Sequence, residues 1–512
     1  MRKAYIPIMI AAILLASCAS DDTDLGGRAI SMIAIDSTSI QAEYNQNKND
    51  VVVIEPLVSQ SQAGQELRYE WEINHEVYST EPVLRYSCTQ LGAFDCRLIV
   101  SNDDGKAFST FRINVNTPYE EGLVIISNAP DGKSMLSFML HNTDGTPDTF
   151  AEGDVFTLNN PEVKFASNVN EVAQSNGSLI LACNGNPSAG EPVTIYYLNE
   201  KTLDLENYVA MPEYPDFQPQ SMMLSKAAYP GASYPTLSSN GKVYEFASTE
   251  GTVVTSTKFS YTYDTDVYAY FDDGTGRNYN IFLWDTELGI PVTMFNGYGG
   301  YYCIADWGTC ANRTAVTPQT NLFAAGADKP VAMFIPRFTK VQLVLATPQI
   351  YIITQAGNQL RRTALDKDVW GYDIEEAKNK FLLRESLAPI GMVGTVPFEK
   401  GMPMIASNTH KRLFYAIGNR IYHWNYQQTT LAQARLFATV GDAGIVIKGF
   451  ELSTDQKTLY VAAYNPAESG LNGSCYIIPI NQSGTTQEIT AGETTAHEHI
   501  SYNPVKIIYK QK

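Results

Sequence analysis

The sequence predicts an all-β chain with two domains that follow an N-terminal export signal. Short runs of residues typical of β-strands recur from about residue 29 to the end of the chain. Glycine, proline, asparagine and aspartate separate these runs, as they do in turns between strands. At 512 residues the chain is too long for one hydrophobic core, so two or more domains are expected.

The composition is that of a packed, acidic protein. Hydrophobic residues make up 44% of the chain, which is ordinary for a globular protein. The 36 Lys and Arg residues stand against 54 Asp and Glu residues, giving a formal net charge of −18. Such an acidic balance argues against nucleic-acid binding, because negative charge would approach the phosphates without compensation.

The first residues have the form of a bacterial export signal. Arg2 and Lys3 precede the apolar run from residue 4 to 16, which is too short to span a bilayer as a stable helix. Its end, Leu15-Ala16-Ser17-Cys18, resembles the lipobox of bacterial lipoproteins. The resemblance implies cleavage after residue 17 and lipidation of the Cys18 thiol, which would anchor the chain to a membrane. The alternative is an ordinary signal peptide followed by a chance cysteine.

Residues 18–28 read as an acidic tether, because Asp21, Asp22 and Asp24 follow the cysteine closely. Cleavage would remove 17 residues including Arg2 and Lys3, which changes the formal charge from −18 to −20. The tether resembles the sorting signal of Bacteroidetes-type lipoproteins, which implies an outer-membrane location facing the cell exterior. A flexible spacer without sorting information is the alternative.

The first domain is expected at residues 29–116. Strands are predicted at residues 51–54, 67–73, 83–86, 94–100 and 108–115. A hairpin turn at 102–105 joins the last two of them. About ninety residues of such strands, with Trp71 on a central strand and in the core, are typical of an immunoglobulin-like sandwich.

This first domain resembles the PKD-like family of bacterial surface proteins. The matching residues are Tyr69-x-Trp71 and the run Leu91-Gly92-x-Phe94-x-Cys96-x-Leu98-x-Val100-Ser101-Asn102. The acidic-aromatic-glycine turn that usually follows the tryptophan is missing, so a divergent member is expected. Together with the lipobox and the repeated predicted strands that follow, the resemblance implies an accessory lipoprotein of outer-membrane nutrient capture. It implies no catalytic residue in this chain.

The second domain, expected at residues 120–512, reads as a β-propeller. The segment 116–122, with a proline and a glycine, is expected to be a short linker. From Gly122 onward, seven strand clusters have a mean spacing in the fifties, which is typical of propeller blades. We expect seven blades, with six or eight as alternatives. The last strand, at 505–509, is placed to complete the first blade and close the ring. Residues 373–384 carry an N-cap and helical spacing, and predict one helical insertion.

Cysteine spacing leaves the pairing of the thiols open. Cys88 and Cys96, and likewise Cys303 and Cys310, are close enough in sequence to form disulfides in an exported chain. Cys96 either pairs with Cys88 or packs in the core. Cys183 and Cys475 lie in apolar segments that are predicted to form strands, and both are expected to be buried thiols.

No motif for catalysis, cofactor binding or metal binding stands out, and we nominate none. Glu493 and the string His497-Glu498-His499 come nearest to a metal site, with a polar loop as the alternative. The Asp264 and Asp266 pair lacks the glycine and glutamate register of an EF-hand.

One glycine-rich and aromatic stretch, residues 295–310, is the candidate ligand site. Its flat apolar side chains could stack on sugar rings, and the candidates are Tyr298, Tyr301, Tyr302 and Trp307. A Cys303–Cys310 disulfide would reduce the entropy that the loop loses on binding. The alternative is an interblade crossing whose aromatic residues fill the core.

These observations lead to a functional expectation. We expect a non-enzymatic binding or accessory lipoprotein on the outer-membrane surface that captures a polysaccharide or a peptide, possesses no cofactor and does not bind nucleic acid. One alternative is a propeller-type hydrolase or lyase that acts on polysaccharide through carboxylates in the central channel. Another is a structural partner of an outer-membrane transporter.

Overall fold

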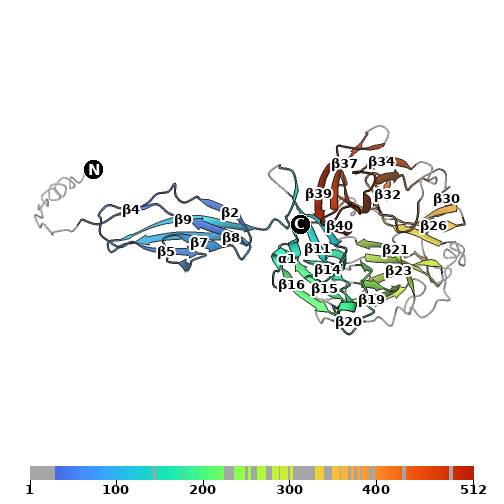
Figure 1. Ribbon diagram of the computed structural model, residues 1–512, viewed down its shortest axis with the longest axis horizontal. Helices are drawn as coiled ribbons and strands as arrows, with labels where there is room; N and C mark the ends of the chain where they lie inside the picture. The colour runs from blue at the N-terminus through green and yellow to red at the C-terminus, as the bar shows by residue number, and fades with distance from the viewer. Residues whose placement is uncertain are drawn as a thin grey trace, which may run out of the picture. The chain divides into compact units, whose positions relative to one another are not determined.

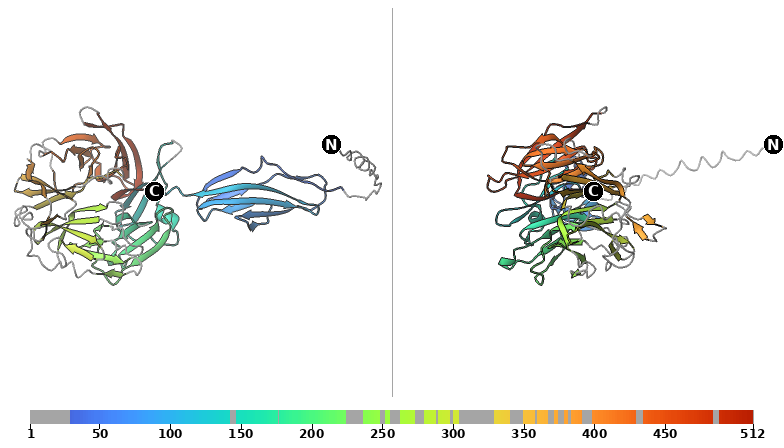
Figure 2. Two further views of the ribbon diagram at one scale, coloured as in Figure 1. Left: turned by 180° about the vertical axis from the view of Figure 1, so that it is seen from behind. Right: turned by 90° about the vertical axis from the view of Figure 1, so that its right-hand side faces the viewer.

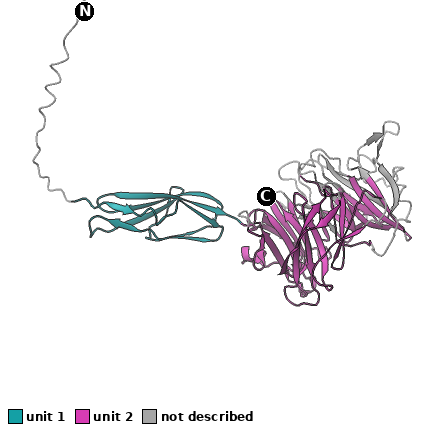
Figure 3. Cartoon of the chain, turned by 90° about the horizontal axis from the view of Figure 1, so that it is seen from above, with its two compact units in different colours: residues 1–117 teal, residues 118–512 magenta. Residues whose placement is uncertain are grey.

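The structure is a computed structural model, which describes 18 stretches of the chain. These are residues 29–141, 146–175, 177–223, 236–247, 252–254, 262–272, 279–287, 289–297, 300–303, 329–339, 349–357, 359–366, 371–373, 378–380, 383–390, 398–428, 434–483 and 488–511. The chain divides into two compact units, Met1–Thr117 and Pro118–Lys512 (Figure 3).

The first unit is built from β-strands in three sheets. Its strands are β1 (Ile33–Ile35), β2 (Glu43–Asn47), β3 (Val51–Ile54), β4 (Val58–Gln60), β5 (Arg68–Ile73), β6 (Glu76–Ser79), β7 (Leu84–Ser87), β8 (Gly92–Ser101) and β9 (Lys106–Asn116). The largest sheet has the order β2-β9-β8-β5-β6, with β2 parallel to β9, while β3 pairs with β7 and β1 with β4. All five predicted strands are present.

The core of this unit lies between the five-stranded sheet and the β3–β7 pair. Side chains of β8 alternate between exposed and buried, as expected for a strand with one covered face. Their buried members join Val52, Leu84 and other side chains of β3 and β7 in one apolar cluster. Trp71 is fully buried in it, as predicted, and its indole N–H donates to the Glu81 carbonyl oxygen at 2.8 Å.

The predicted hairpin turn between β8 and β9 is confirmed. Asn102 is buried, and its side-chain oxygen accepts hydrogen bonds at 2.9 Å from the backbone N–H groups of Asp104 and Gly105. Its amide nitrogen donates to the Ser31 carbonyl oxygen at 2.9 Å. An asparagine that closes its own turn in this way also ties the turn to the start of the unit.

The second unit contains seven sheets of four consecutively paired antiparallel strands within the described ranges, and they follow one another around a ring (Figure 1). The first has β12 (Thr149–Phe150), β11 (Ser134–Leu140), β10 (Gly122–Asn128) and β40 (Asn503–Lys510). The second has β13 (Val169–Ser175), β14 (Ser178–Cys183), β15 (Thr194–Asn199) and β16 (Leu205–Ala210), and the third has β17 (Ser221–Met223), β18 (Thr236–Ser239), β19 (Lys242–Ala247) and β20 (Thr252–Val254).

The other four sheets repeat the pattern. The fourth has β21 (Tyr263–Asp272), β22 (Tyr279–Asp285), β23 (Ile290–Gly297) and β24 (Gly300–Cys303), and the fifth has β25 (Lys329–Phe334), β26 (Gln349–Ala356), β27 (Gln359–Asp366) and β30 (Leu383–Ile390). The sixth has β31 (Met404–Ser407), β32 (Arg412–Ile417), β33 (Arg420–Trp424) and β34 (Arg435–Thr439). The seventh has β35 (Val446–Leu452), β36 (Thr458–Tyr464), β37 (Gly473–Gln482) and β38 (Ile489–Ala491), and β39 (Thr495–Ser501) also pairs with β37.

This arrangement is a β-propeller, with one edge strand of each sheet nearest the axis (Figure 2). Contacts join β13 to β17, β21 to β25 and β31 to β35, and these are the edge strands of neighbouring sheets. The C-terminal strand β40 contacts both β13 and β35 and pairs with β10, from Gly122 opposite Lys510 to Asn128 opposite Asn503. The predicted closure of the ring by the last strand is therefore confirmed.

Packing between sheets explains why the propeller strands have almost continuously apolar sequences. In β10, six consecutive residues are buried, because both faces of the sheet are covered by neighbouring sheets. Gly122 starts this strand at a close approach, since a Cβ there would stand 2.1 Å from the Met139 carbonyl oxygen.

The predicted helix at 373–384 is wrong. Its described residues belong to β-structure: β28 (Gly371–Asp373) pairs with β29 (Lys378–Lys380), and β30 begins at Leu383. A helix of this length is marginal without tertiary support, so sheet pairing overrides its local spacing. The α-helix of the described residues is α1 (Val155–Asn159), which Asp154 caps and whose Val155 and Phe156 are buried against the first two sheets. A short 3₁₀ turn, η1, covers Pro187–Ala189.

Candidate functional site

The predicted site residues fall partly outside the described residues. Cys18, Tyr298, Trp307 and Cys310 lie there, so their predictions stay predictions. Tyr301, Tyr302 and Cys303 belong to β24, the outermost strand of the fourth sheet, where Tyr302 pairs with Phe295 and Tyr301 with Asn296 of β23. The described part of the glycine-aromatic stretch is therefore a hairpin at the rim of a blade.

The two described cysteines of the first unit do not form a disulfide with each other. Cys88 and Cys96 are both buried free thiols, which corrects the local pairing that sequence spacing left open. Cys88 follows β7 and Cys96 lies in β8, so the two residues belong to opposite layers of the core. Burial raises the pKa of Cys96 to about 11, which keeps the thiol protonated. Cys183 and Cys475 are fully buried, as predicted.

The histidine-rich string near the C-terminus lies on strand β39 rather than in a loop. His499 has a φ of 58° at the point where the register of β39 with β37 shifts, and its Nδ1 contacts the Leu471 carbonyl oxygen at 2.8 Å. The His497 ring instead packs edge-on against Phe150. Across the described ranges, no group of three His, Cys, Asp or Glu residues is placed to hold a metal ion.

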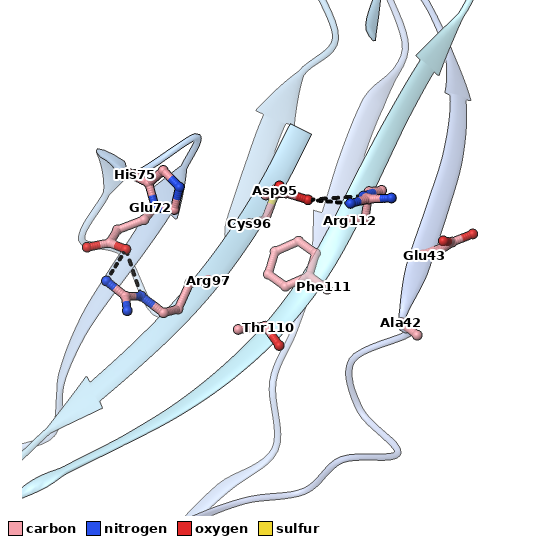
Figure 4. Close-up of a pocket in the computed structure, with 10 residues that line it drawn as sticks. All are labelled: Ala42, Glu43, Glu72, His75, Asp95, Cys96, Arg97, Thr110, Phe111 and Arg112. Atoms are coloured by element: carbon pink, nitrogen blue, oxygen red, sulfur yellow. Dashed lines mark hydrogen bonds and ion pairs between the residues drawn. The ribbon is translucent and has the colours of Figure 1, made fainter. Parts of the chain in front are cut away.

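A hollow of about 450 Å³ lies on the five-stranded sheet of the first unit (Figure 4). Its charged residues pair across neighbouring strands. Arg97 binds Glu72 at 2.6 Å, and Arg112 donates twice to one oxygen of Asp95, at 2.8 and 3.0 Å. Three of these four side chains are well exposed, and the partners satisfy each other's hydrogen-bonding groups, so the pairs add little to stability.

A second group of polar side chains lies on, or next to, the edge strands nearest the axis of the propeller. We call it the axial cluster, and it consists of Glu171, Asp264, Asp266, Tyr268, Arg337, Lys400, Glu451 and Lys506.

Glu171 and Lys506 form the buried part of the axial cluster. The Lys506 ammonium contacts the Glu171 carboxylate between β40 and β13, and the Met222 N–H of β17 donates to the same carboxylate oxygen at 3.3 Å. Burial raises the pKa of Glu171, against the opposing effect of the Lys506 charge. Three consecutive sheets thus meet at one carboxylate.

Strand β21 brings the fourth sheet to the same place. Tyr268 interacts electrostatically with both Lys506 and Glu171, and burial is the main reason that its pKa is raised. On the same strand, Asp264 and Asp266 bind the Lys400 ammonium at 2.6 and 3.5 Å. Lys400 lies just before the sixth sheet, so the cluster reaches across the ring.

Arg337 and Glu451 complete the axial cluster from the remaining sheets. Arg337 follows β25 and donates to the Glu451 carboxylate of β35 at 3.1 Å. Its backbone pairs with β31, where its N–H donates to the Ala406 carbonyl oxygen at 2.7 Å. The Arg337 charge also acts on Lys506, so the two halves of the cluster are close to each other.

The axial cluster offers both hydrogen-bond donors and acceptors to a ligand. The Arg337 and Asp266 side chains are 60% and 62% exposed, whereas Glu171 and Glu451 are 8% exposed behind their cations. The buried acids hold the bases in place, and the exposed members remain accessible to solvent.

Comparison with known proteins adds no assignment to this geometry. No family model and no curated protein sequence matches the chain. Among solved structures, a quinoprotein alcohol dehydrogenase-like protein from Bacteroides thetaiotaomicron shares 14% identity, with 95% of this chain and all of that chain covered and a TM-score of 0.45. The periplasmic gluconolactonase of Pseudomonas aeruginosa shares 10% identity over 76% of this chain and 99% of that chain, with a TM-score of 0.44. At these values we draw no conclusion from either similarity.

Sequence reasoning missed the axial cluster because its members are far apart along the chain. Glu171 and Lys506 are separated by 335 positions, and no short motif contains both. A signal is nevertheless present, since charged residues stand among apolar ones within the edge strands β13, β35 and β40. In the described part of the chain, no helix is long and apolar enough to cross a bilayer.

A buried histidine gives the second unit a predictable pH response. His423 on β33 is packed between the rings of Phe414 and Phe437, and burial, followed by the charges of Arg412 and Arg435, lowers its pKa to about 4. The unfolded chain takes up this proton near pH 6.5, so stability is full above pH 6.5 and falls as the pH drops toward 4.

We expect this histidine to account for about 3 kcal/mol of the acid-induced loss in unfolding free energy. Urea unfolding at pH 7 and pH 4.5 should therefore show a smaller difference in His423→Phe than in the parent. His141→Gln, at an exposed histidine, is the matched control. An equal pH dependence in the parent and His423→Phe would contradict the assignment.

Proposed function

We propose that this chain is a lipid-anchored, non-enzymatic binding protein of the outer membrane, displayed to the cell exterior, that captures a glycan or a peptide. The observation that carries the proposal is the axial cluster, in which side chains from sheets around the propeller meet at the axis. The centre of such a ring is a natural place for a ligand, because several blades contribute groups there.

The energetic cost of the axial cluster supports a ligand-binding role. Burying charges costs free energy that an apolar packing would avoid. Glu171 and Glu451 are nevertheless buried beside partly exposed cations rather than replaced by apolar residues. We infer that these groups are retained because they position the exposed members for a ligand.

The first unit fits the role of a spacer in this proposal. We propose that it is a PKD-type immunoglobulin-like sandwich, supported by the two-layer core around Trp71 and by the parallel pairing of β2 with β9. Its charged sheet face is self-paired, as described for the hollow near Asp95. The propeller, and not this unit, is therefore the part that we assign to ligand capture.

The anchor is tested by replacing the lipobox cysteine. In Cys18→Ala we expect complete loss of acyl labelling and release of the protein from the membrane fraction, because the acylated thiol is absent. The parent protein should be digested when protease is added to intact cells. Cys96→Ala, at a buried cysteine, is the control that keeps its label. Unchanged labelling of Cys18→Ala, or protection of the parent until lysis, would contradict the proposal.

A second candidate function is a hydrolase or lyase acting on polysaccharide, which the same cluster favours through its carboxylates. Glu171 and Glu451 would supply the acid and the base, and burial already raises the pKa of Glu171. Release of reducing ends from a polysaccharide, and its loss in Glu451→Gln, would establish this function in place of simple capture.

A further inference from the structure

Resting on the proposed function, we propose that the axial cluster binds the hydroxyl groups of a neutral sugar. The proposal names both the place of capture and the class of ligand. It separates a neutral glycan from an acidic polysaccharide and from a peptide.

The charge balance of the cluster is the first argument. Glu171, Asp264, Asp266 and Glu451 are opposed by Arg337, Lys400 and Lys506, which leaves a formal charge of −1. Each base contacts at least one of these acids. An anionic ligand would meet an excess of carboxylates here, in a chain whose net charge is −18.

The accessible groups are the second argument. Arg337 and Asp266 are the most exposed charged members, and Lys400 and Lys506 are 39% and 28% exposed. Solvent therefore reaches donors and an acceptor at one site. A sugar hydroxyl both donates and accepts, so neighbouring hydroxyls on one ring can use a carboxylate and a cation together. A trans peptide unit also has a donor and an acceptor, but its N–H and C=O point to opposite sides of the chain, so they do not face one carboxylate and one cation together.

Tyr268 is the third argument. It is partly exposed and lies within electrostatic range of Lys506, Glu171 and Asp266. A tyrosine presents an apolar ring with a polar hydroxyl at its tip, which suits the apolar face and hydroxyl edge of a sugar. We therefore assign the Tyr268 ring and the charged groups to the same ligand.

The experiment is calorimetric titration of the full mature chain in detergent with three sets of probes. These are neutral polysaccharides (mannan, dextran and amylopectin), acidic ones (polygalacturonate and alginate) and a casein peptide digest. We expect binding to at least one neutral polysaccharide and to neither of the other sets. The affinity should be nearly unchanged between about 0.05 and about 0.5 M NaCl, because hydroxyl recognition involves no net ligand charge.

The variants Arg337→Gln and Asp266→Asn place the site. Both side chains are more than half exposed, and a Gln at 337 can still donate a hydrogen bond to the buried Glu451 carboxylate, so the fold should survive. Each substitution should weaken binding about tenfold or more by removing a charged hydrogen-bonding group. The control is Arg435→Gln. Arg435 is as exposed as Arg337, lies on the outermost strand of the sixth sheet, and pairs with Glu488 at 2.7 Å. Thermal unfolding of each variant verifies the fold.

The outcomes separate this inference from the proposed function. Binding only to acidic polysaccharide or only to peptides overturns the neutral-sugar assignment and leaves capture intact. Neutral-sugar binding that both axial variants retain at parental affinity overturns the site. Binding to no probe overturns the capture function together with this inference.

Discussion

A chain that ends at Tyr502 is expected to lose the cooperative unfolding transition of the second unit. The deletion removes β40, which pairs with β10, contacts β13 and β35 and buries Ile507. It also removes the Lys510 ammonium, which donates at 2.7 and 2.6 Å to the carbonyl oxygens of Tyr119 and Glu120. The loss should exceed about 5 kcal/mol, which is comparable with the stability of a whole domain.

Calorimetry of the deleted chain provides the measurement. We expect the transition of the second unit to disappear, while the first unit, which has its own core around Trp71, still unfolds cooperatively. A chain lacking residues 19–28, a tether segment of the same length as the deleted one, is the control. An unchanged transition in the chain that ends at Tyr502 would show that ring closure does not stabilise the propeller.

Replacing Lys506 by Met is expected to lower the free energy of unfolding by about 3–5 kcal/mol. The substitution leaves the Glu171 carboxylate buried without its cation, and one hydrogen bond from Met222 cannot compensate for that charge. Adding Glu171→Gln to Lys506→Met should restore most of the loss, because the remaining amide is neutral. Urea unfolding of the two single variants and the double variant measures the coupling directly.

The Arg435 and Glu488 pair is the comparison for this cycle. Both side chains are more than half exposed, so the same analysis should give a coupling below about 1 kcal/mol. If Lys506→Met costs no more than Arg435→Met, or if Glu171→Gln does not rescue it, the axial pair is not buried as described.

The propeller could be predicted because its strands are covered on both faces. Runs such as those of β10, β14 and β36 are almost continuously apolar, and their recurrence marks the blades. The closing strand was predictable from its place, since 505–509 is one more β-type run after the last blade, although of these five residues only Ile507 is buried. In the first unit, the strict alternation of β8 identified a strand with one buried face.

Other elements could not be predicted from local pattern. The strands β1, β2, β4 and β6 are short and partly exposed, so neither apolar runs nor alternation reveal them. The interval 373–384 carries helical spacing, yet its described residues pair as strands, because sheet partners outweigh a short helical preference.

The sequence predicted a ligand-binding site in the propeller but not the residues of the axial cluster. The sequence pointed to aromatic residues of one segment, and Tyr301 and Tyr302 lie on the outermost strand of a blade. The axial cluster instead unites residues from strands at opposite ends of the second unit, such as β13 and β40. Such a site exists only in the closed ring, because closure places β40 next to β13.

The most direct measurement is a crystal structure of the chain with a bound neutral oligosaccharide. We expect the sugar to lie at the axis, with ring hydroxyls within hydrogen-bonding distance of Arg337 and Asp266 and one face near Tyr268. A sugar bound instead on the β23–β24 hairpin at the rim, with the axial cluster unchanged, would contradict the central claim that the propeller captures its ligand at the axis.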